Sequence, residues 1–232
     1  MKRPTRATRT GRPDTFGALP PSPLVAVVVV IFTVDDGDLR ALLIHRSAEP
    51  QQGLWAIPGG RLKPGESLVD AATRKLVDET GVRDLFLEQL YTFNHLDDVT
   101  PGGSLAVTYF ALVDHQRVRL ADRTDWRPAW FSMRSLPELA FRNEEVLQYA
   151  LERLRNKLAY TNVAYSLLPG RFTLSQLQGV YESILGQELD KRNFRKRMLS
   201  LEIIEGTDER QVERAGRPAR LYRFSSREPV AL

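Results

Sequence analysis

Apolar and polar positions along residues 24–131 follow a pattern that predicts a sheet with one helix inserted into it. Apolar, β-branched runs predict strands at residues 24–33, 40–46, 54–57, 85–93, 104–113 and 129–131. Asp36-Gly37 joins the first two runs, because this dipeptide supplies the positive φ of a tight hairpin turn. The helix begins near Ser67, which with Asp70 resembles a capping box, and Gly81 is placed to end it. The first domain is therefore expected to mix strands and helices, α+β in class.

A second long helix is predicted after Asn143, which is expected to act as its N-cap. Its apolar stripe comprises Val146, Leu147, Ala150, Leu151, Leu154 and Leu158. We expect this helix to pack on the first domain and to lead into a second one.

The last third of the chain predicts two more helices and a hairpin. One helix covers residues 172–185 and ends at Gly186, and the next covers 191–199 with Asp190 as its cap. The residues expected in their core are Leu174, Leu177, Val180, Tyr181, Ile184, Phe194, Met198 and Leu201. Residues 201–205 and 221–224 predict two short strands. Helix, glycine turn, helix and hairpin in this order predict a winged helix-turn-helix domain.

Length and composition narrow the class of protein. A chain of 232 residues has room for one medium domain and one small domain, so we expect a flexible arm at 1–22, a first domain with its linking helix at 23–159 and a second domain at 160–232. The absence of Cys excludes disulfides, thiolate metal sites and Cys nucleophiles. The apolar run at 24–32 is far shorter than the roughly 20 residues of a membrane span, and a cytoplasmic protein without membrane contact is expected.

Charge is distributed unevenly between these parts. Residues 1–22 hold five Lys or Arg against one Asp, a net charge of +4, and residues 160–232 hold twelve Lys or Arg against nine Asp or Glu, a net charge of +3. The total of +4 leaves −3 for residues 23–159. Two basic ends around an acidic middle indicate a nucleic-acid binder with a small-molecule domain, and chance is the alternative.

One contiguous motif carries a resemblance. Residues 60–66, Gly-Arg-Leu-Lys-Pro-Gly-Glu, are followed after seven residues by Arg-Lys-Leu-Val-Asp-Glu-Thr-Gly-Val at 74–82. This arrangement resembles the Nudix box, Gx5Ex7REUxEExGU with U a bulky aliphatic residue, and the preceding Gly-Leu-Trp-Ala-Ile-Pro-Gly-Gly at 53–60 is also typical of that family. The resemblance implies a Nudix α/β/α sandwich.

The spacing within the box explains its chemistry. Helix positions 75, 78 and 79 lie three or four residues apart, so three carboxylates there would share one face and could hold hard divalent cations. Such cations would bridge a pyrophosphate and activate water. Arg74 is expected to pair with Glu66 and so to fix the preceding loop to the helix.

The chain departs from the box at the decisive position, where Lys75 stands in place of the usual metal-binding Glu. At about 5 Å and an effective dielectric near 20, each unit charge interacts at about 3 kcal/mol per unit of partner charge, so this cation opposes a metal cluster. We expect Lys75 to pair with Asp78 or Glu79 in the place of the metal. The expectation is a fold with no catalytic residues, no bound metal, no cofactor and no need for Mg2+; a working enzyme with a relocated base is the alternative.

The second predicted helix of the winged domain combines an apolar face with a basic one. Its candidate DNA-binding residues are Lys191, Arg192, Asn193, Arg195, Lys196 and Arg197. The hairpin loop adds Arg210, Arg214, Arg217 and Arg220, which suit a wing laid along phosphates. A basic face of this kind fits a recognition helix in the major groove, and an ordinary solvated helix is the alternative.

With both halves in place, the chain looks like the Nudix-related transcriptional regulators of NAD metabolism. The stretches that carry this likeness, besides the altered box, are 130–132, 136–141, 172–178 and 190–194. The resemblance implies a homodimeric repressor that binds double-stranded operator DNA and is released when ADP-ribose or a related nucleotide binds the Nudix domain.

Candidate ligand-binding residues follow from the same resemblance: Arg46, Trp55, Gly60, Arg61, Glu66, Arg74, Lys75 and Glu79. Arg46 sits where Nudix proteins often place an Arg that faces the pyrophosphate, although a surface Arg at a strand end is the alternative. Trp55 could stack on a base, but core packing is the better interpretation.

Two other functions stay open at this point. One is a nucleotide pyrophosphohydrolase of the ADP-ribose class, which the box favours and Lys75 opposes. The other is a sugar-responsive regulator of the same family, which would leave the phosphate site empty.

Overall fold

The computed structural model describes residues 23–81, 86–94, 103–120, 127–211 and 218–231. The predicted arm at 1–22 lies outside these residues, as do Arg214 and Arg217 of the predicted wing.

The first half of the chain forms a mixed seven-stranded sheet. Its strands are β1 Leu24–Asp35, β2 Asp38–His45, β3 Trp55–Ala56, β4 Gly59–Arg61, β5 Phe86–Asn94, β6 Ser104–Leu112 and β7 Pro128–Ser132. They run in the order β3-β2-β1-β6-β5, with β4 paired to β1 and β7 paired to β2. β1 and β6 are parallel, and every other pair is antiparallel. All six predicted strands are confirmed, and the short β4 was not predicted.

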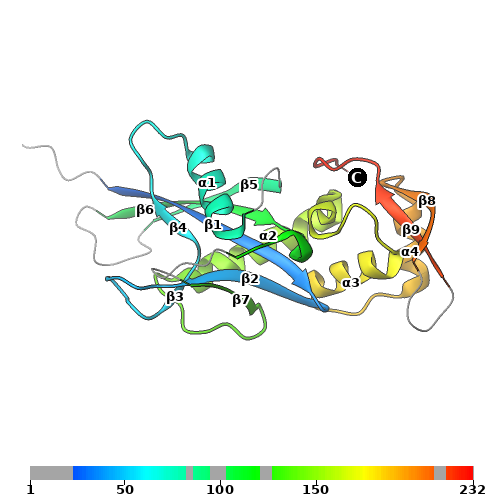
Figure 1. Ribbon diagram of the computed structural model, residues 1–232, viewed down its shortest axis with the longest axis horizontal. Coiled ribbons are helices and arrows are strands. Elements are labelled where there is room, and N and C mark those ends of the chain that lie inside the picture. The colour runs from blue at the N-terminus through cyan, green and yellow to red at the C-terminus, as the bar shows by residue number, and fades with distance from the viewer. Residues whose placement is uncertain (1–22, 82–85, 95–102, 121–126, 212–217, 232) are drawn as a thin grey trace, which may run out of the picture.

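Helices cover both faces of this sheet, because successive side chains of β1 point to opposite faces and are apolar on both. Val29 and Ile31 pack against Leu76 of α1 (Leu68–Thr80), whereas Val30 and Phe32 belong to the cluster that contains the apolar stripe of α2 (Asn143–Tyr160). A two-residue period therefore gives β1 two buried faces, and the three layers form the predicted α/β/α sandwich (Figure 1). The sequence between β6 and β7 adds a short 3-10 helix, η1 (His115–Arg117).

Local caps set the ends of α1 as predicted. The Ser67 hydroxyl accepts the Asp70 N–H at 3.1 Å, and Gly81 ends the helix in the left-handed region at φ 69°.

The predicted cap of α2 is wrong. Arg142 occupies the N-cap position at φ 54° without a side-chain cap, directly after Phe141 at φ 56°. The Asn143 carboxamide oxygen instead accepts the buried backbone N–H of Ile57 at 2.7 Å. A buried N–H needs an acceptor, and this long-range partner uses the side chain that would otherwise cap the helix. α2 thus starts from two successive left-handed residues, a conformation that costs free energy for side chains other than Gly.

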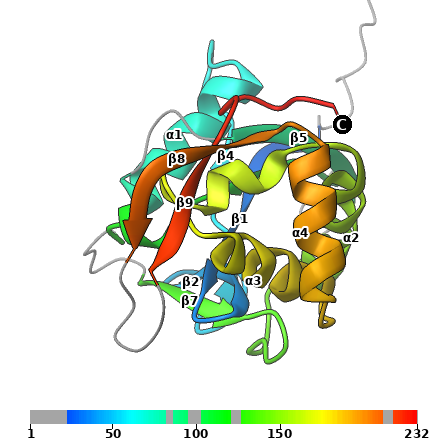
Figure 2. The same cartoon turned by 90° about the vertical axis from the view of Figure 1, so that its right-hand side faces the viewer.

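The last third forms the predicted winged helix, with α3 Leu174–Leu185, α4 Lys191–Ser200, β8 Ile204–Gln211 and β9 Ala219–Phe224. Thr173 and Gln176 form a reciprocal capping box at the start of α3, and Asp190 caps α4 by accepting the Asn193 N–H. Figure 2 shows the β8–β9 hairpin projecting from the side opposite α4. The first predicted strand, at 201–205, begins three residues late, because Leu201 still caps α4 and Glu202 turns the chain at φ 55°.

One hydrophobic core joins the two halves. Leu43 and Phe110 of the sheet, Leu154 of α2, Leu177 of α3 and Met198 of α4 belong to the same buried cluster. The chain passes between the halves through the 3-10 helix η2 (Val163–Leu167), which lies against α2 and α3. Because α2 contributes to both sides of this core, a displacement of α2 must be felt by the winged helix.

Hydrogen bonds fix the same connection. The Arg155 guanidinium of α2 donates to the Ile184 carbonyl at the end of α3, at 2.8 Å. The buried Asn162 side chain accepts the Val230 N–H at 2.8 Å and donates to the Glu228 carbonyl at 3.0 Å, so the C-terminal segment is tied to the linker.

Within the described residues, no helix has the length and apolar character needed to cross a membrane.

The Tyr181 hydroxyl is a buried polar group in the contact between α3 and α4, and we expect its removal to change the stability of the fold. It is buried without a hydrogen-bond partner among the described residues, and the ring packs on Phe194 at 5.2 Å. Burial raises the pKa of Tyr181 to about 12, although Arg197 opposes the shift. Replacing Tyr181 by Phe removes an unsatisfied polar group, so we expect the free energy of unfolding in urea at pH 7 to rise by about 1 kcal/mol.

The pH dependence of the free energy of unfolding provides a control for this prediction. The folded pKa lies above the ordinary value of about 10, so the wild type loses stability as the pH rises from about 10 to 12, whereas Tyr181→Phe lacks this contribution. The advantage of the variant should therefore be larger at pH 11 than at pH 7. A variant less stable than the wild type at both pH values contradicts the prediction.

Candidate functional site

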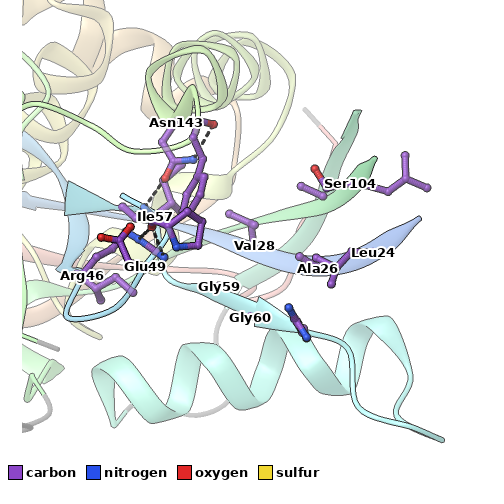
Figure 3. Close-up of a pocket in the computed structure, with 17 residues that line it drawn as sticks. Leu24, Ala26, Val28, Arg46, Glu49, Ile57, Gly59, Gly60, Ser104 and Asn143 are labelled. Atoms are coloured by element: carbon purple, nitrogen blue, oxygen red, sulfur yellow. Dashed lines mark hydrogen bonds between the residues drawn. The ribbon is translucent and has the colours of Figure 1, made fainter. Parts of the chain in front are cut away.

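A cavity of about 310 Å3 lies on the α2 face of the sheet, beside the first turn of α2. Its floor is Ala26 and Val28 of β1, and its walls include Gly59 and Gly60 of β4 and Phe141 before α2. Figure 3 shows Arg46 and Asn143 on one side of the cavity and β4 running between the cavity and α1. The size lies at the lower end of the range typical of small-molecule pockets, about 300–1,000 Å3.

Arg46 is a fixed cation on the cavity wall. Its guanidinium donates to the carbonyls of Pro50 at 2.7 Å and Ala48 at 3.2 Å, and it lies 4.4 Å from the centre of the Phe141 ring. Desolvation lowers the pKa of Arg46, partly opposed by the negative charge of Glu49. These contacts hold the planar guanidinium at the edge of the cavity, where it can meet an anion without first losing rotamer freedom.

Phe141 and Asn143 are among the cavity residues that the sequence did not predict as site residues. The Phe141 N–H donates to the Gln51 side chain at 2.8 Å, and Asn143 bonds to Ile57 across 86 positions of sequence. The sequence indicated only a helix N-cap at Asn143, whereas in the structure its side chain accepts the Ile57 N–H beside the cavity. Together they place the start of α2 in the cavity wall.

The loop of the Nudix box is fixed as predicted. Arg74 makes two hydrogen bonds to the Glu66 carboxylate, at 2.7 and 2.9 Å, and the Lys63 N–H adds a third at 3.1 Å. These bonds, that from Arg74 first, lower the pKa of Glu66 to about 2. The pair stabilises the loop and does not line the cavity.

Lys75 extends from α1 toward the back of β4. A Cβ atom on Gly60 would lie only 2.9 Å from Lys75 Cε and 3.4 Å from Nζ, so the lysine stem packs where glycine leaves room. Gly60 in turn lines the cavity. Glu79, one helical turn further along α1, is fully buried. The Lys75 ammonium therefore lies against β4, on the α1 position where the resemblance to the Nudix box implies a metal-binding carboxylate, and the expected absence of a metal stays a prediction.

Among the described residues, no group of three or more His, Cys, Asp or Glu side chains is arranged to hold a metal ion.

The structure brings together only part of the predicted ligand set. Arg46, Gly60 and Arg61 line the cavity. Trp55, Glu66, Arg74, Lys75 and Glu79 do not line it. The Trp55 ring packs on Phe131 at 4.6 Å and on His45 at 5.1 Å, which favours the core-packing interpretation. Ligand contacts of all eight residues stay predictions.

The second candidate site is the basic face of α4. Phe194 and Met198 are buried and anchor the helix, while the six predicted DNA-binding side chains of α4 are exposed. These are Lys191, Arg192, Asn193, Arg195, Lys196 and Arg197. Within the described part of the chain, no ion pair engages any of the five cations. Their charge is thus available to an external polyanion.

The hairpin carries a second set of basic side chains. Arg210 and Arg220 lie opposite each other on β8 and β9. The prediction that they belong to the connecting loop is therefore wrong, because the strands extend as far as these residues. The Arg220 guanidinium donates to the Thr207 carbonyl at 3.0 Å and lies 5.8 Å from the Tyr222 ring centre. Arg223 pairs with Glu205 at 2.9 Å, so only part of the positive charge on this hairpin is free of an internal partner.

Comparison with known proteins matches both halves. Residues 23–150 match the family model described as NUDIX domain, and residues 164–224 match that described as NrtR DNA-binding winged helix domain. The ADPR responsive transcriptional repressor NtrR of Acinetobacter baylyi is 41% identical over 212 residues, which cover 88% of this chain and 83% of that protein. The ADP-ribose pyrophosphatase of Methanocaldococcus jannaschii is 29% identical over 127 residues, 54% of this chain and 72% of that protein.

Two solved structures add the spatial comparison. Shewanella oneidensis NrtR complexed with a 27mer DNA superimposes with a TM-score of 0.77 at 35% identity, covering 87% of this chain and 93% of that chain. The NUDIX domain of the same protein complexed with ADP ribose gives a TM-score of 0.52 at 32% identity, covering 62% of this chain and 94% of that chain.

Proposed function

The chain belongs to the NUDIX family, with an NrtR DNA-binding winged helix domain in its C-terminal part, and on that premise we propose that it is a transcriptional repressor of NAD-metabolism genes that ADP-ribose releases from operator DNA. The observation that carries the proposal is the position of α2. It begins in the wall of the cavity and packs against α3 of the winged helix, so a ligand and a DNA site share one rigid element.

The names of the relatives identify ADP-ribose and DNA as the two molecules to which this proposal assigns the chain. The A. baylyi relative is named for its response to ADPR, and the S. oneidensis structures contain DNA in one case and ADP ribose in the other. In this chain Arg46 and Arg61 offer cations to a diphosphate, and the exposed face of α4 offers cations to the DNA backbone. A palindromic operator and a homodimer belong to the same proposal, because one short recognition helix reads too few base pairs for specificity. The repressor would act in the cytoplasm.

The test uses DNA selected by the protein itself. Fragments retained from a randomised duplex pool should converge on a palindrome whose half-sites are about one helical turn apart. ADP-ribose should then release the protein from the selected duplex, and L-arabinose should not. Failure to enrich any sequence contradicts DNA recognition, whereas release by the sugar alone would favour the sugar-responsive alternative.

Hydrolysis of ADP-ribose is the second candidate function, favoured by the likeness to the M. jannaschii pyrophosphatase. We expect the wild type to hydrolyse ADP-ribose negligibly with Mg2+ or Mn2+, because Lys75 places a positive charge on the face of α1 where the Nudix box implies metal-binding carboxylates. Lys75→Glu should bind Mn2+ at least tenfold more tightly in calorimetry, since about 3 kcal/mol per unit charge is at stake at such distances.

Lys75→Gln is the matched control, because it removes the cation without adding a ligand. It should gain less Mn2+ affinity than Lys75→Glu. Robust turnover by the wild type would sink the repressor-only interpretation, and equal Mn2+ binding by all three proteins would show that position 75 lies outside the metal site.

A further inference from the structure

A buried serine hydroxyl in the floor of the cavity has no hydrogen-bond partner among the described residues. Ser104 is the first residue of β6, and its side chain is 7% exposed. It is one of the residues that line the cavity. A buried hydroxyl without a partner lowers the stability of the unliganded fold, and a bound molecule can supply the missing partner. The hydroxyl therefore marks a point where the cavity can meet a polar atom of its ligand.

The strand register directs this hydroxyl to the α2 face of the sheet. β1 and β6 are parallel, with Leu24 opposite Ser104 and Ala26 opposite Ala106. Side chains opposite each other on neighbouring strands point to the same face, and these four residues all line the cavity. Figure 3 shows Ser104 near Leu24 and Ala26, on the far side of Val28 from Arg46.

Two alanines make the floor low beside Ser104. Val30 and Phe32, further along the same face of β1, are large and fully enclosed in the core. Ala26 and Ala106 lie side by side at the cavity and present one methyl group each. Their small side chains leave room above a flat apolar surface, which suits one face of an aromatic ring.

Positive charge lies on the other side of β1. Arg46 directly follows β2, and Arg61 belongs to β4, where it lies opposite Ala26. β2 and β4 pair with one edge of β1, whereas β6 pairs with the other edge. Among the described lining residues, Ser104 is the single polar side chain that β6 contributes. A diphosphate thus finds its cations on the β2 and β4 side, and the β6 side is left for an uncharged part of the ligand.

One hydroxyl beside an apolar floor favours a base over a sugar. A ribose ring carries several hydroxyl groups, each of which needs a partner when it leaves water, and the β6 side offers one such side chain. An adenine ring has two apolar faces and a polar edge. The Ser104 hydroxyl can donate to a ring nitrogen of that edge or accept from the exocyclic amine.

We propose that Ser104 binds the adenine base of the ligand, with the polar edge of the ring at its hydroxyl and one ring face on Ala26 and Ala106. The inference rests on the proposed function, in which ADP-ribose is the ligand. It goes further by assigning the base to the β6 side of the cavity and the diphosphate to the side of Arg46 and Arg61.

Two measurements on full-length Ser104→Ala distinguish a ligand contact from a structural role. Without ligand, removal of the unpartnered hydroxyl should not lower the melting temperature. In calorimetry the dissociation constant for ADP-ribose should rise about five- to tenfold, because the base loses its hydrogen bond. Ser166→Ala removes a buried hydroxyl from η2, outside the cavity lining, and should bind ADP-ribose as the wild type does. An unchanged dissociation constant in Ser104→Ala, or a lower melting temperature together with weaker binding, overturns the proposal.

AMP and ribose 5-phosphate, used as competitors of ADP-ribose, separate the base from the sugar. AMP carries the base and should lose about five- to tenfold in affinity for Ser104→Ala, whereas ribose 5-phosphate lacks the base and should bind unchanged. Ala26→Val raises the floor without removing the hydroxyl, and it should also weaken AMP more than ribose 5-phosphate. An equal loss for both competitors in Ser104→Ala places a sugar hydroxyl at this position and overturns the assignment.

The outcomes also separate this proposal from the proposed function. If ADP-ribose releases operator DNA from the wild type but binds Ser104→Ala equally tightly, the base site is refuted and the repressor stands. If AMP binding depends on Ser104 while ADP-ribose leaves operator binding unchanged, the base site stands and ADP-ribose is refuted as effector.

Discussion

Replacing Arg192 and Arg195 by Ala is expected to abolish sequence-specific DNA binding while leaving the fold intact. Both side chains are exposed on α4, on a helix held in the core by Phe194 and Met198. A good bidentate contact between Arg and a base is worth about 1–3 kcal/mol, so loss of two contacts lowers the affinity on the order of a hundredfold or more. Fluorescence anisotropy with the selected operator and with a scrambled duplex measures the loss of preference directly.

A variant on the hairpin separates base reading from attraction to phosphates. Arg220→Ala should weaken binding to the operator and the scrambled duplex alike and reduce the salt dependence by about one counterion. Arg117→Ala, which removes an exposed Arg from η1 in the first domain, is the charge-matched control and should bind as the wild type. If Arg192→Ala/Arg195→Ala keeps its preference for the operator, α4 is not the recognition helix.

What the sequence predicts well is local. Ser67, Gly81 and Asp190 act within four residues of their own position, so their roles as helix caps are legible in the sequence and are confirmed. The apolar stripes of α2 and α3 are confirmed for the same reason, since a helix repeats its buried face every three or four residues. The Arg74–Glu66 pair also lies within one contiguous motif.

What the sequence hides is assembled over long range. The cavity takes its walls from β1, β4, β6, the 46–50 segment and the start of α2, which no local pattern connects. Asn143 stands directly before an apolar stripe, where a helix cap is the natural prediction, yet the buried Ile57 N–H claims its side chain. For Trp55 the sequence already favours core packing over base stacking, and the contacts of its ring with Phe131 and His45 support that interpretation. At Asn143, the tertiary demand for a hydrogen-bond partner overrides the local preference for a helix cap.

ADP-ribose is expected to lower operator affinity by about 5- to 150-fold, the range of coupling free energies of about 1–3 kcal/mol. The structural reason lies in α2. The helix begins directly after Phe141 and Arg142, which both have positive φ, and Phe141 and Asn143 line the cavity. The C-terminal half of α2 contacts α3 through the hydrogen bond from Arg155 to the Ile184 carbonyl. A ligand that rearranges the Phe141 turn therefore displaces the element on which α3 and α4 rest.

One substitution can break this coupling without touching either site. Arg155→Met removes the bond to the Ile184 carbonyl but lies outside the cavity lining and outside α4. We expect it to bind ADP-ribose and operator DNA separately with near wild-type affinity and to lose most of the ADP-ribose effect on DNA. Glu152→Ala, an exposed neighbour on the same helix, should keep the full effect and serves as the control.

Reciprocity makes the measurement strict, because operator DNA must weaken ADP-ribose binding by the same factor by which ADP-ribose weakens operator binding. Calorimetric titration of ADP-ribose into free and into operator-bound protein gives the factor directly, and anisotropy with and without ADP-ribose gives it from the other side. Equal ADP-ribose affinities in the two titrations rule ADP-ribose out as effector and leave DNA recognition by α4 untouched. A wild-type factor retained in Arg155→Met would instead show that the signal reaches the winged helix by another route, through η2 and the C-terminal segment bound to Asn162.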